Sequence, residues 1–158
     1  MTARTAAKAL VDRLEEAHVD YELIPHPRTE TAADEAKALG VEPSQVAKTL
    51  VLTTPDGFVR IVLPASERFD ASKVRSALET RDVQLAPEDV LAREYPEFEL
   101  GAVPPIAGAR RDRVLIDRRL LEQDSVVVEA GTHEQSLRLK TTDLARIADA
   151  SLADLCQD

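Results

Sequence analysis

The sequence predicts an α+β protein: a single domain, residues 1–158, in which a mixed, largely antiparallel and partly closed β-sheet is flanked by helices. Three observations favour this class. The chain has 158 residues, 44% of them hydrophobic, which is enough for one sizeable core. Helical and strand-like stretches mix without the regular alternation of a doubly wound sheet. Near the centre, the turn Thr54-Pro55-Asp56-Gly57 joins two apolar runs, as in an antiparallel hairpin.

The N-terminal region predicts one helix and one strand. Residues 5–17 carry apolar side chains at helical spacing, namely Leu10, Val11, Leu14 and Ala17. The following residues alternate apolar and acidic side chains, from Val19 through Tyr21 to Leu23. This alternation is typical of a strand with one face in solvent.

A well-bounded helix is predicted between Thr31 and Gly40. The Thr31 hydroxyl can cap its first turn, where Asp34 and Glu35 also lie favourably in the helix dipole. Ala32, Ala36 and Leu39 share an apolar stripe, and Gly40 supplies the left-handed residue that ends the helix.

A hairpin with a lysine at its entrance is predicted next. Pro43 begins a short helical turn, residues 49–53 form a buried strand, and residues 58–63 form the return strand. If Thr54 faces Phe58, Lys48 lies near Pro64 and on the same face as Leu50 and Leu52. An ammonium on an apolar face needs an anion or a cavity, because unpaired burial is costly. The alternative is a lysine whose stem packs while its amine reaches water.

The remaining elements follow from local signals. Asp70 caps a helix that carries Val74, Ala77 and Leu78, and Pro87 opens another helix through Tyr95. Strands are predicted at residues 83–85, 114–116, 125–130 and 136–139, and a last helix at residues 143–148. Between them, Gly101-Ala102-Val103-Pro104-Pro105 is a rigid loop that can hold a few backbone amides in place, or an ordinary connection.

Charge and composition narrow the function classes. A net charge of -9 argues against a nonspecific nucleic-acid binder, although a local basic patch remains compatible with it. The densest basic cluster lies between Arg110 and Arg119, and its alternative is a solvated loop and helix end. The amino terminus lacks the apolar region of a signal peptide, and no apolar run reaches the ~20 residues of a membrane span. We therefore expect a soluble, cytoplasmic protein that acts neither at a membrane nor on DNA.

Several chemistries are disfavoured. Cys156 is the sole cysteine, and His18, His26 and His133 lie far apart, so we expect neither a disulfide framework nor a zinc or other metal site. The chain has no nucleophile elbow, Walker loop or dinucleotide fingerprint, and we expect no cofactor. The position of His26 between two prolines favours a structural role in a turn over a role as general base.

Four blocks resemble one known family. The run HPxxxTxxxEAxxLGVxxxQVAKTLVL from His26, LPA from Leu63, GAVPP from Gly101 and AGT from Ala130 occur in the order typical of the YbaK/EbsC family. These are aminoacyl-tRNA editing domains associated with prolyl-tRNA synthetase. The similarity extends from about His26 to Leu144. Ile106-Ala107-Gly108 departs from the family pattern, in which many members carry a phenylalanine and glycine directly.

The resemblance implies a set of site residues. Lys48 becomes the candidate catalytic residue, and Gly101 and Pro105 correspond to a loop that lines the aminoacyl pocket. Further candidates for substrate binding are Tyr21, His26, Thr31, Ala65, Ala102, Gly131, Ser136 and Asp143. Each of Tyr21, Ser136 and Asp143 has a structural alternative: a core ring, a strand-edge hydroxyl and a helix cap. For the tRNA, the candidates are Arg110, Arg111 and Arg113.

The function implied is that of a trans-editing deacylase, which hydrolyses the ester of a mischarged tRNA. Such an activated ester needs a positioned water and stabilisation of the developing oxyanion, which Lys48 and the amides near Gly101 and Ala102 could provide. The resemblance implies a small or thiol-bearing amino acid, with alanine and cysteine on proline tRNA as first candidates, and an aminoacyl-tRNA synthetase as a partner. Two alternatives are a non-catalytic module that binds aminoacyl-tRNA or a nucleotide, and a structural accessory of a synthetase.

Overall fold

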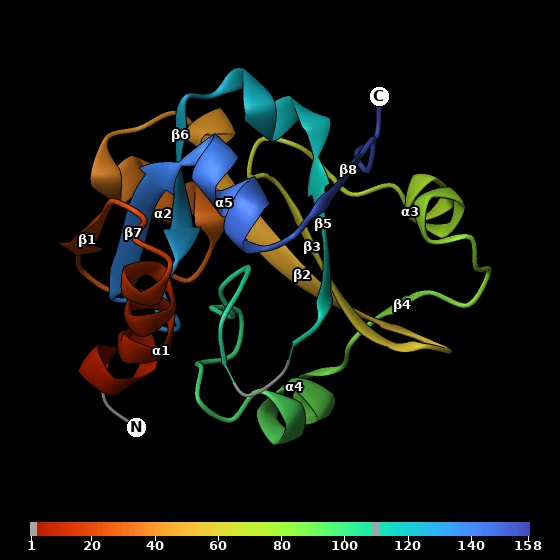
Figure 1. Cartoon of the computed structure of the whole chain (residues 1–158), viewed down its shortest axis with the longest axis horizontal. Helices are drawn as coiled ribbons and strands as arrows, with labels where there is room; N and C mark the ends of the chain where they lie inside the picture. Colours follow the sequence, from red (N-terminus) through yellow and green to blue (C-terminus); the bar gives the residue numbers. More distant parts are fainter. Residues whose placement is uncertain (1–2, 109–110) are drawn as a thin grey trace.

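An eight-stranded mixed sheet organises the chain, and five α-helices flank it (Figure 1). The structure, a computed structural model, describes residues 3–108 and 111–158. The helices are α1 (Ala3–Glu16), α2 (Ala32–Leu39), α3 (Ala71–Leu78), α4 (Glu88–Glu94) and α5 (Thr141–Ile147), with 3-10 turns η1 (Pro43–Gln45) and η2 (Arg118–Glu122). The strands are β1 (Tyr21–Pro25), β2 (Val46–Thr54), β3 (Gly57–Pro64), β4 (Gln84–Leu85), β5 (Arg113–Asp117), β6 (Ser125–Glu129), β7 (Gln135–Lys140) and β8 (Ser151–Ala153).

The predicted class is confirmed, with one difference in the sheet. The strand order is β1-β7-β6-β2-β3-β5-β8, with β4 paired to β2. The pairs β1–β7, β6–β7, β2–β3 and β2–β4 are antiparallel, whereas β2–β6, β3–β5 and β5–β8 are parallel. The expected partial closure does not form in the described part of the chain, because β1 and β8 lie at opposite ends of this path.

Apolar side chains on the two faces of the sheet pack under different helices. One face, which includes Val62 and Val128, packs against α1 and α5. The other face carries Val46 and Val127 under α2, and Leu52 and Leu63 beside α3. Among the described residues, no helix is both long and apolar enough to cross a membrane.

The central hairpin differs from its prediction by one residue. Thr54 pairs with Gly57, so the loop contains only Pro55 and Asp56, and Lys48 pairs with Leu63 instead of Pro64. The strand also begins earlier than predicted, at Val46, because that residue pairs with β6. Lys48 therefore lies inside β2 and not at its mouth, although its side chain shares the predicted face with Leu50 and Leu52.

Local signals located most other elements correctly. The predicted caps of α2 and α3 are present, and the αL residue Gly40 ends α2. The strand predicted at residues 19–23 forms at 21–25, where it pairs with β7. Strand β8 and turn η2 were not predicted. Both depend on distant neighbours: β8 exists only through its pairing with β5, and the Asp117 side chain accepts from the Leu155 amide at 2.8 Å.

Candidate active site

The edge of β2 contains a gap between two partner strands. Val46 and Ala47 pair with β6, whereas Leu52 and Thr53 pair with β4. Residues 48–51 have no strand partner on that edge within the described ranges, apart from the Ala86 amide, which donates to the Val51 carbonyl at 2.9 Å. The gap leaves room for a pocket in the middle of the sheet.

A small, mainly apolar pocket lies at this gap. Its volume is about 170 Å³, and its walls are Thr49, Leu50, Val51, Leu85, Ala86, Leu91, Gly101 and Val103. The Thr49 hydroxyl is buried and has no hydrogen-bond partner among the described residues. The pocket therefore combines a hydrophobic wall with a single unused polar group, as ligand sites commonly do.

Lys48 directly precedes the pocket residue Thr49 in β2 but does not line the pocket. Its half-buried amine donates to the Glu67 carbonyl at 2.5 Å, and it forms no ion pair with a described residue. Burial is the main cause that lowers the pKa of the Lys48 ammonium, and the nearby Arg68 guanidinium lowers it further. The amine is thus neither free in bulk solvent nor held by a carboxylate, which leaves it available for exchange to another oxygen acceptor.

The loop that begins at Gly101 is held in place by His133. Gly101 adopts φ +80°, and a Cβ added there would lie 3.4 Å from His133 Cε1. Nε2 of His133 lies 2.6 Å from the Leu100 carbonyl, so this nitrogen carries the ring hydrogen. His133 Nδ1 is buried without a partner in the described part of the chain. His133 directly follows the AGT block, but no role for it was predicted once a zinc site had been set aside.

One expected amide donor is already engaged. The Ala102 amide donates to the Glu99 carbonyl at 3.0 Å, within the loop. Ala102 is also fully buried. Gly101 and Val103 line the pocket and remain the candidates for backbone contacts with a substrate.

A largely buried polar network lies under α2 and includes two of the predicted residues, His26 and Ser136. Ser136 Oγ contacts the Glu35 carboxyl group and lies 2.8 Å from His26 Nε2, while His26 Nδ1 lies 2.7 Å from the Pro27 carbonyl. The Ser136 hydroxyl donates to the Glu35 carboxyl group, and Nδ1 of His26 donates to the Pro27 carbonyl, which can only accept. Burial is the main cause that raises the pKa of the Glu35 carboxyl group. Thr31 Oγ1 caps α2 by accepting from the Asp34 amide at 3.1 Å.

Glu129 adds a second buried carboxyl group to this network. Burial is the main cause that raises its pKa to about 9, and the neighbouring Glu35 carboxylate adds to the shift. Glu129 lies on β6 directly opposite Ser136 of β7. Glu129 was not among the predicted site residues, because a single carboxylate after an apolar run locally indicates only the end of a strand.

The other predicted substrate residues are dispersed. The Tyr21 hydroxyl donates to Glu15 at 2.8 Å, and Asp143 pairs with Arg146 at 3.4 Å in the first turn of α5. Ala65 packs beside α2, and Gly131 accepts from the Glu99 amide at 2.9 Å. Pro105 lines a different pocket, described next.

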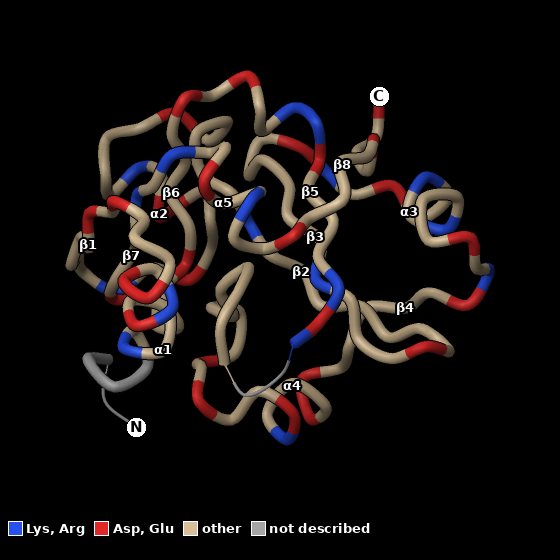
Figure 2. Tube along the Cα trace, viewed as in Figure 1, with Lys and Arg blue, Asp and Glu red and all other residues tan. Residues whose placement is uncertain are grey.

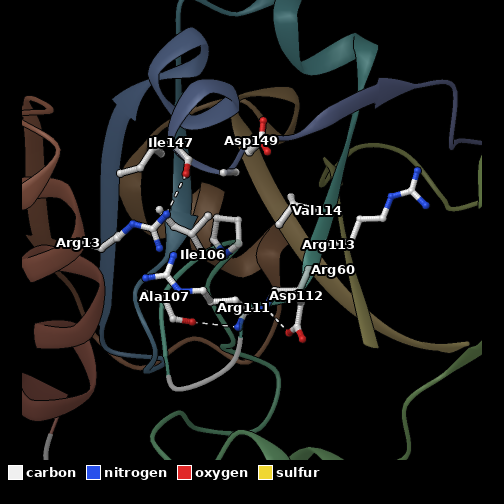
Figure 3. A pocket seen from close by; sticks show the side chains of 12 residues that line it. Arg13, Arg60, Ile106, Ala107, Arg111, Asp112, Arg113, Val114, Ile147 and Asp149 are labelled. Atoms are coloured by element: carbon white, nitrogen blue, oxygen red, sulfur yellow. Dashed lines mark hydrogen bonds and ion pairs between the residues drawn. The ribbon is translucent and has the colours of Figure 1, made fainter. Parts of the chain in front are cut away.

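The predicted basic cluster divides into two parts. Arg111 and Arg113 line a second pocket of about 320 Å³ together with Arg13 and Arg60 (Figure 3). Arg119 is instead neutralised by Asp117 at 3.2 Å and Asp154 at 3.1 Å, beside the acidic C-terminal segment (Figure 2). Arg110 lies outside the described residues. Among residues 3–108 and 111–158, there is no group of three or more His, Cys, Asp or Glu side chains that could hold a metal ion.

Comparison with known proteins places the chain in a family. A sequence model described as an aminoacyl-tRNA editing domain matches residues 26–147. Curated relatives include a proline--tRNA ligase from Thermosipho melanesiensis, 26% identical over 72% of this chain, and one from Thermotoga neapolitana, 32% identical over 49% of it. The chain spans only 20% and 14% of these two ligases.

A solved structure supports the same assignment. It is described as a candidate trans-editing enzyme for prolyl tRNA synthetase and superposes with a TM-score of 0.87 at 25% identity, covering 100% of this chain and 99% of that one. The match of the sequence model to more than three quarters of the chain decides the relationship. This protein belongs to the aminoacyl-tRNA editing domain family.

Proposed function

We propose that this protein is a trans-editing deacylase that hydrolyses the ester between a small or thiol-bearing amino acid and a tRNA on which it was wrongly placed. The observation that carries the proposal is the apolar pocket of about 170 Å³ at the open edge of β2, whose wall residue Thr49 directly follows Lys48 in the strand. Small-molecule sites usually measure roughly 300–1,000 Å³, so this pocket suits a side chain smaller than most ligands. Alanine and cysteine on proline tRNA are the first substrates to test.

The chemistry requires little beyond orientation and charge. An aminoacyl ester is activated, so hydrolysis needs a water near the carbonyl carbon and stabilisation of the oxyanion that develops. In our proposal, the Lys48 ammonium exchanges the Glu67 carbonyl for a substrate oxygen. The aminoacyl side chain enters the apolar pocket, and a ribose hydroxyl of the substrate activates the water. The bond from the carbonyl carbon to the ribose oxygen breaks, and that oxygen takes the proton.

A synthetase partner is part of the proposal. The proline--tRNA ligases that resemble this chain are roughly three and a half times its length, since the matched 115 and 78 residues make up only 20% and 14% of them, so most of each ligase lies outside the matched region. We propose that tRNA selection is supplied in part by such a partner, in the compartment where translation takes place.

The test is a deacylation screen across tRNAs charged with alanine, cysteine, serine and proline. The Lys48→Met variant keeps the apolar stem and removes the charged donor. We expect it to slow hydrolysis of the preferred ester by about 10²–10³-fold, the usual effect of removing one oxyanion donor. Lys37→Met, at an exposed position of α2, is the matched control and should retain the wild-type rate.

Two outcomes would contradict the proposal. If Lys48→Met deacylates at the wild-type rate, Lys48 has no part in the mechanism. If the wild-type protein slows the spontaneous hydrolysis of every charged tRNA, it binds and protects the ester, and it is a binding module instead of an enzyme.

A further inference from the structure

The second pocket lies across the sheet from Lys48. Its walls include Ile147 and Val114, which belong to the core under α1 and α5, whereas the Lys48 side chain is on the α2 and α3 face. Three elements bring arginines to it: Arg13 from α1, Arg60 from β3, and Arg111 from the segment before β5 (Figure 3). Its volume of about 320 Å³ is within the roughly 300–1,000 Å³ of small-molecule sites.

Arg60 lines this pocket, but its charge is neutralised by an ion pair within the protein. Its guanidinium is buried, pairs with Asp112 at 3.0 Å, and donates to the carbonyls of Pro104 and Ala107, each at 2.9 Å. All of these contacts are internal. Arg60 therefore positions the Pro104–Ala107 wall and leaves little of its charge for a ligand.

Arg13 and Arg111 carry the charge that is not neutralised. Arg13 donates to the Ile147 carbonyl at 3.1 Å, and neither arginine forms an ion pair with a described residue. Both also line the neighbouring pocket beside α1, and their guanidinium groups point toward the same space in Figure 3. Asp149, also in the wall, directs its carboxylate away from them in the same view.

Arg113 does not join this pair. Its strand neighbour Val114 faces the α1 side, so alternation along β5 directs Arg113 to the opposite face. In Figure 3 its guanidinium points away from Arg13. Arg13 and Arg111 are separated by almost a hundred residues in the sequence, and Arg111 is the member of this pair that was among the predicted tRNA-binding candidates.

We propose that this pocket is a phosphate-binding site whose charged ligands are Arg13 and Arg111. Two guanidinium groups directed at one hollow repel each other unless an anion lies between them, and their planar donor forks match phosphate oxygens. The site and the apolar pocket share one loop: Gly101 and Val103 line the apolar pocket, while Pro105, Ile106 and Ala107 line the phosphate site. The phosphate is thus either one of the tRNA backbone, which depends on the proposed function, or that of a small phosphate compound.

The experiment compares Arg13→Gln and Arg111→Gln with Arg75→Gln, an exposed arginine of α3 at the far side of the molecule. Uncharged tRNA, which has no ester, is titrated at several salt concentrations, and pyrophosphate is tested separately by its effect on thermal stability. We expect Arg13→Gln and Arg111→Gln each to weaken tRNA binding several-fold and to reduce the salt slope by about 1, as for one lost phosphate contact. Arg75→Gln should bind as the wild type does.

Each outcome has a distinct meaning. Loss of tRNA affinity in both variants supports a tRNA phosphate as the ligand. If only the stabilisation by pyrophosphate is lost, the site holds a small phosphate compound. If Arg111→Gln changes neither the tRNA affinity nor the stabilisation by pyrophosphate, the inference is overturned. Because Arg111 is exposed, its substitution should leave the fold intact, so the test remains valid even if Arg13→Gln folds poorly. A wild-type protein that binds tRNA through these arginines but hydrolyses no ester would disprove the proposed function and leave this site standing.

Discussion

At the scale of single residues, the buried carboxyl groups of Glu35 and Glu129 make stability depend on pH. The pKa of Glu129 is raised from 4.5 to about 9, mainly by burial. The folded protein therefore keeps a proton that the unfolded chain releases above pH 4.5. This contribution to stability is complete below pH 4.5 and is lost as the pH rises through about 9.

Replacing Glu129 by glutamine should remove this loss. Glutamine has a similar shape and cannot ionise, so Glu129→Gln should unfold at a higher urea concentration than the wild type at pH 8.5. The expected gain is on the order of a few kcal/mol, and it should shrink toward pH 5. Urea denaturation at both pH values measures it. Glu134→Gln, at an exposed position in the turn that follows β6, controls for the loss of one charge. An equal gain in stability in that variant would disprove the role given to the buried Glu129 carboxyl group.

At the scale of elements, two glycines occupy the same backbone region for different purposes. Gly40 (φ +69°) ends α2 and has open space around its Cβ position, whereas Gly101 (φ +80°) lies against His133 and lines the apolar pocket. A side chain in the left-handed region costs about 1–2 kcal/mol. Only at Gly101 would the added methyl group also contact another side chain, that of His133.

The pair Gly101→Ala and Gly40→Ala separates these effects. Both variants should lose about 1–2 kcal/mol of unfolding free energy in urea, because both place a Cβ at positive φ. Deacylation should fall at least several-fold only in Gly101→Ala, since only that loop contacts the substrate in our proposal. Equal activity in the two variants would argue against a role for this loop in substrate binding.

At the scale of the whole molecule, Arg60 links the central hairpin to the segment between α4 and β5. Its side chain and that of Asp112 are 2% and 4% exposed, and its guanidinium also lies 5.1 Å from the centre of the Tyr95 ring. Arg60 thus joins the hairpin to the loop whose residues line both pockets. The sequence shows it only as one charge in an apolar run.

Arg60→Leu should therefore be severely destabilising. It removes the buried guanidinium that pairs with Asp112 at 3.0 Å and takes the Arg60 donors from two carbonyls, which we expect to cost about 3–5 kcal/mol. Arg138→Leu, which breaks the exposed pair with Glu22, should cost less than about 1 kcal/mol. Chemical denaturation of both variants is the measurement. A loss at Arg60 no larger than at Arg138 would show that the buried pair contributes little to the fold.

Features that depend on residues close together in the sequence were predicted correctly, whereas features that depend on distant residues were not. Thr31, Asp70 and Gly40 were predicted correctly because a helix cap involves residues within four positions of one another. The hairpin register was wrong by one residue because the number of loop residues depends on how the turn closes. The pocket residues Leu85 and Leu91, and the partners of Arg13, could not be foreseen from local pattern.

The sequence by itself determined the helices, their caps, the central hairpin and the family, since these depend on neighbouring residues and on ordered motifs. Only the tertiary structure decided that β6 and β4 divide the edge of β2, that the Lys48 amine lies on the Glu67 carbonyl, and that Arg13 and Arg111 line the same pocket. The reason is physical: strand pairing and ion clusters join residues that are far apart in the chain, and no local period records such contacts.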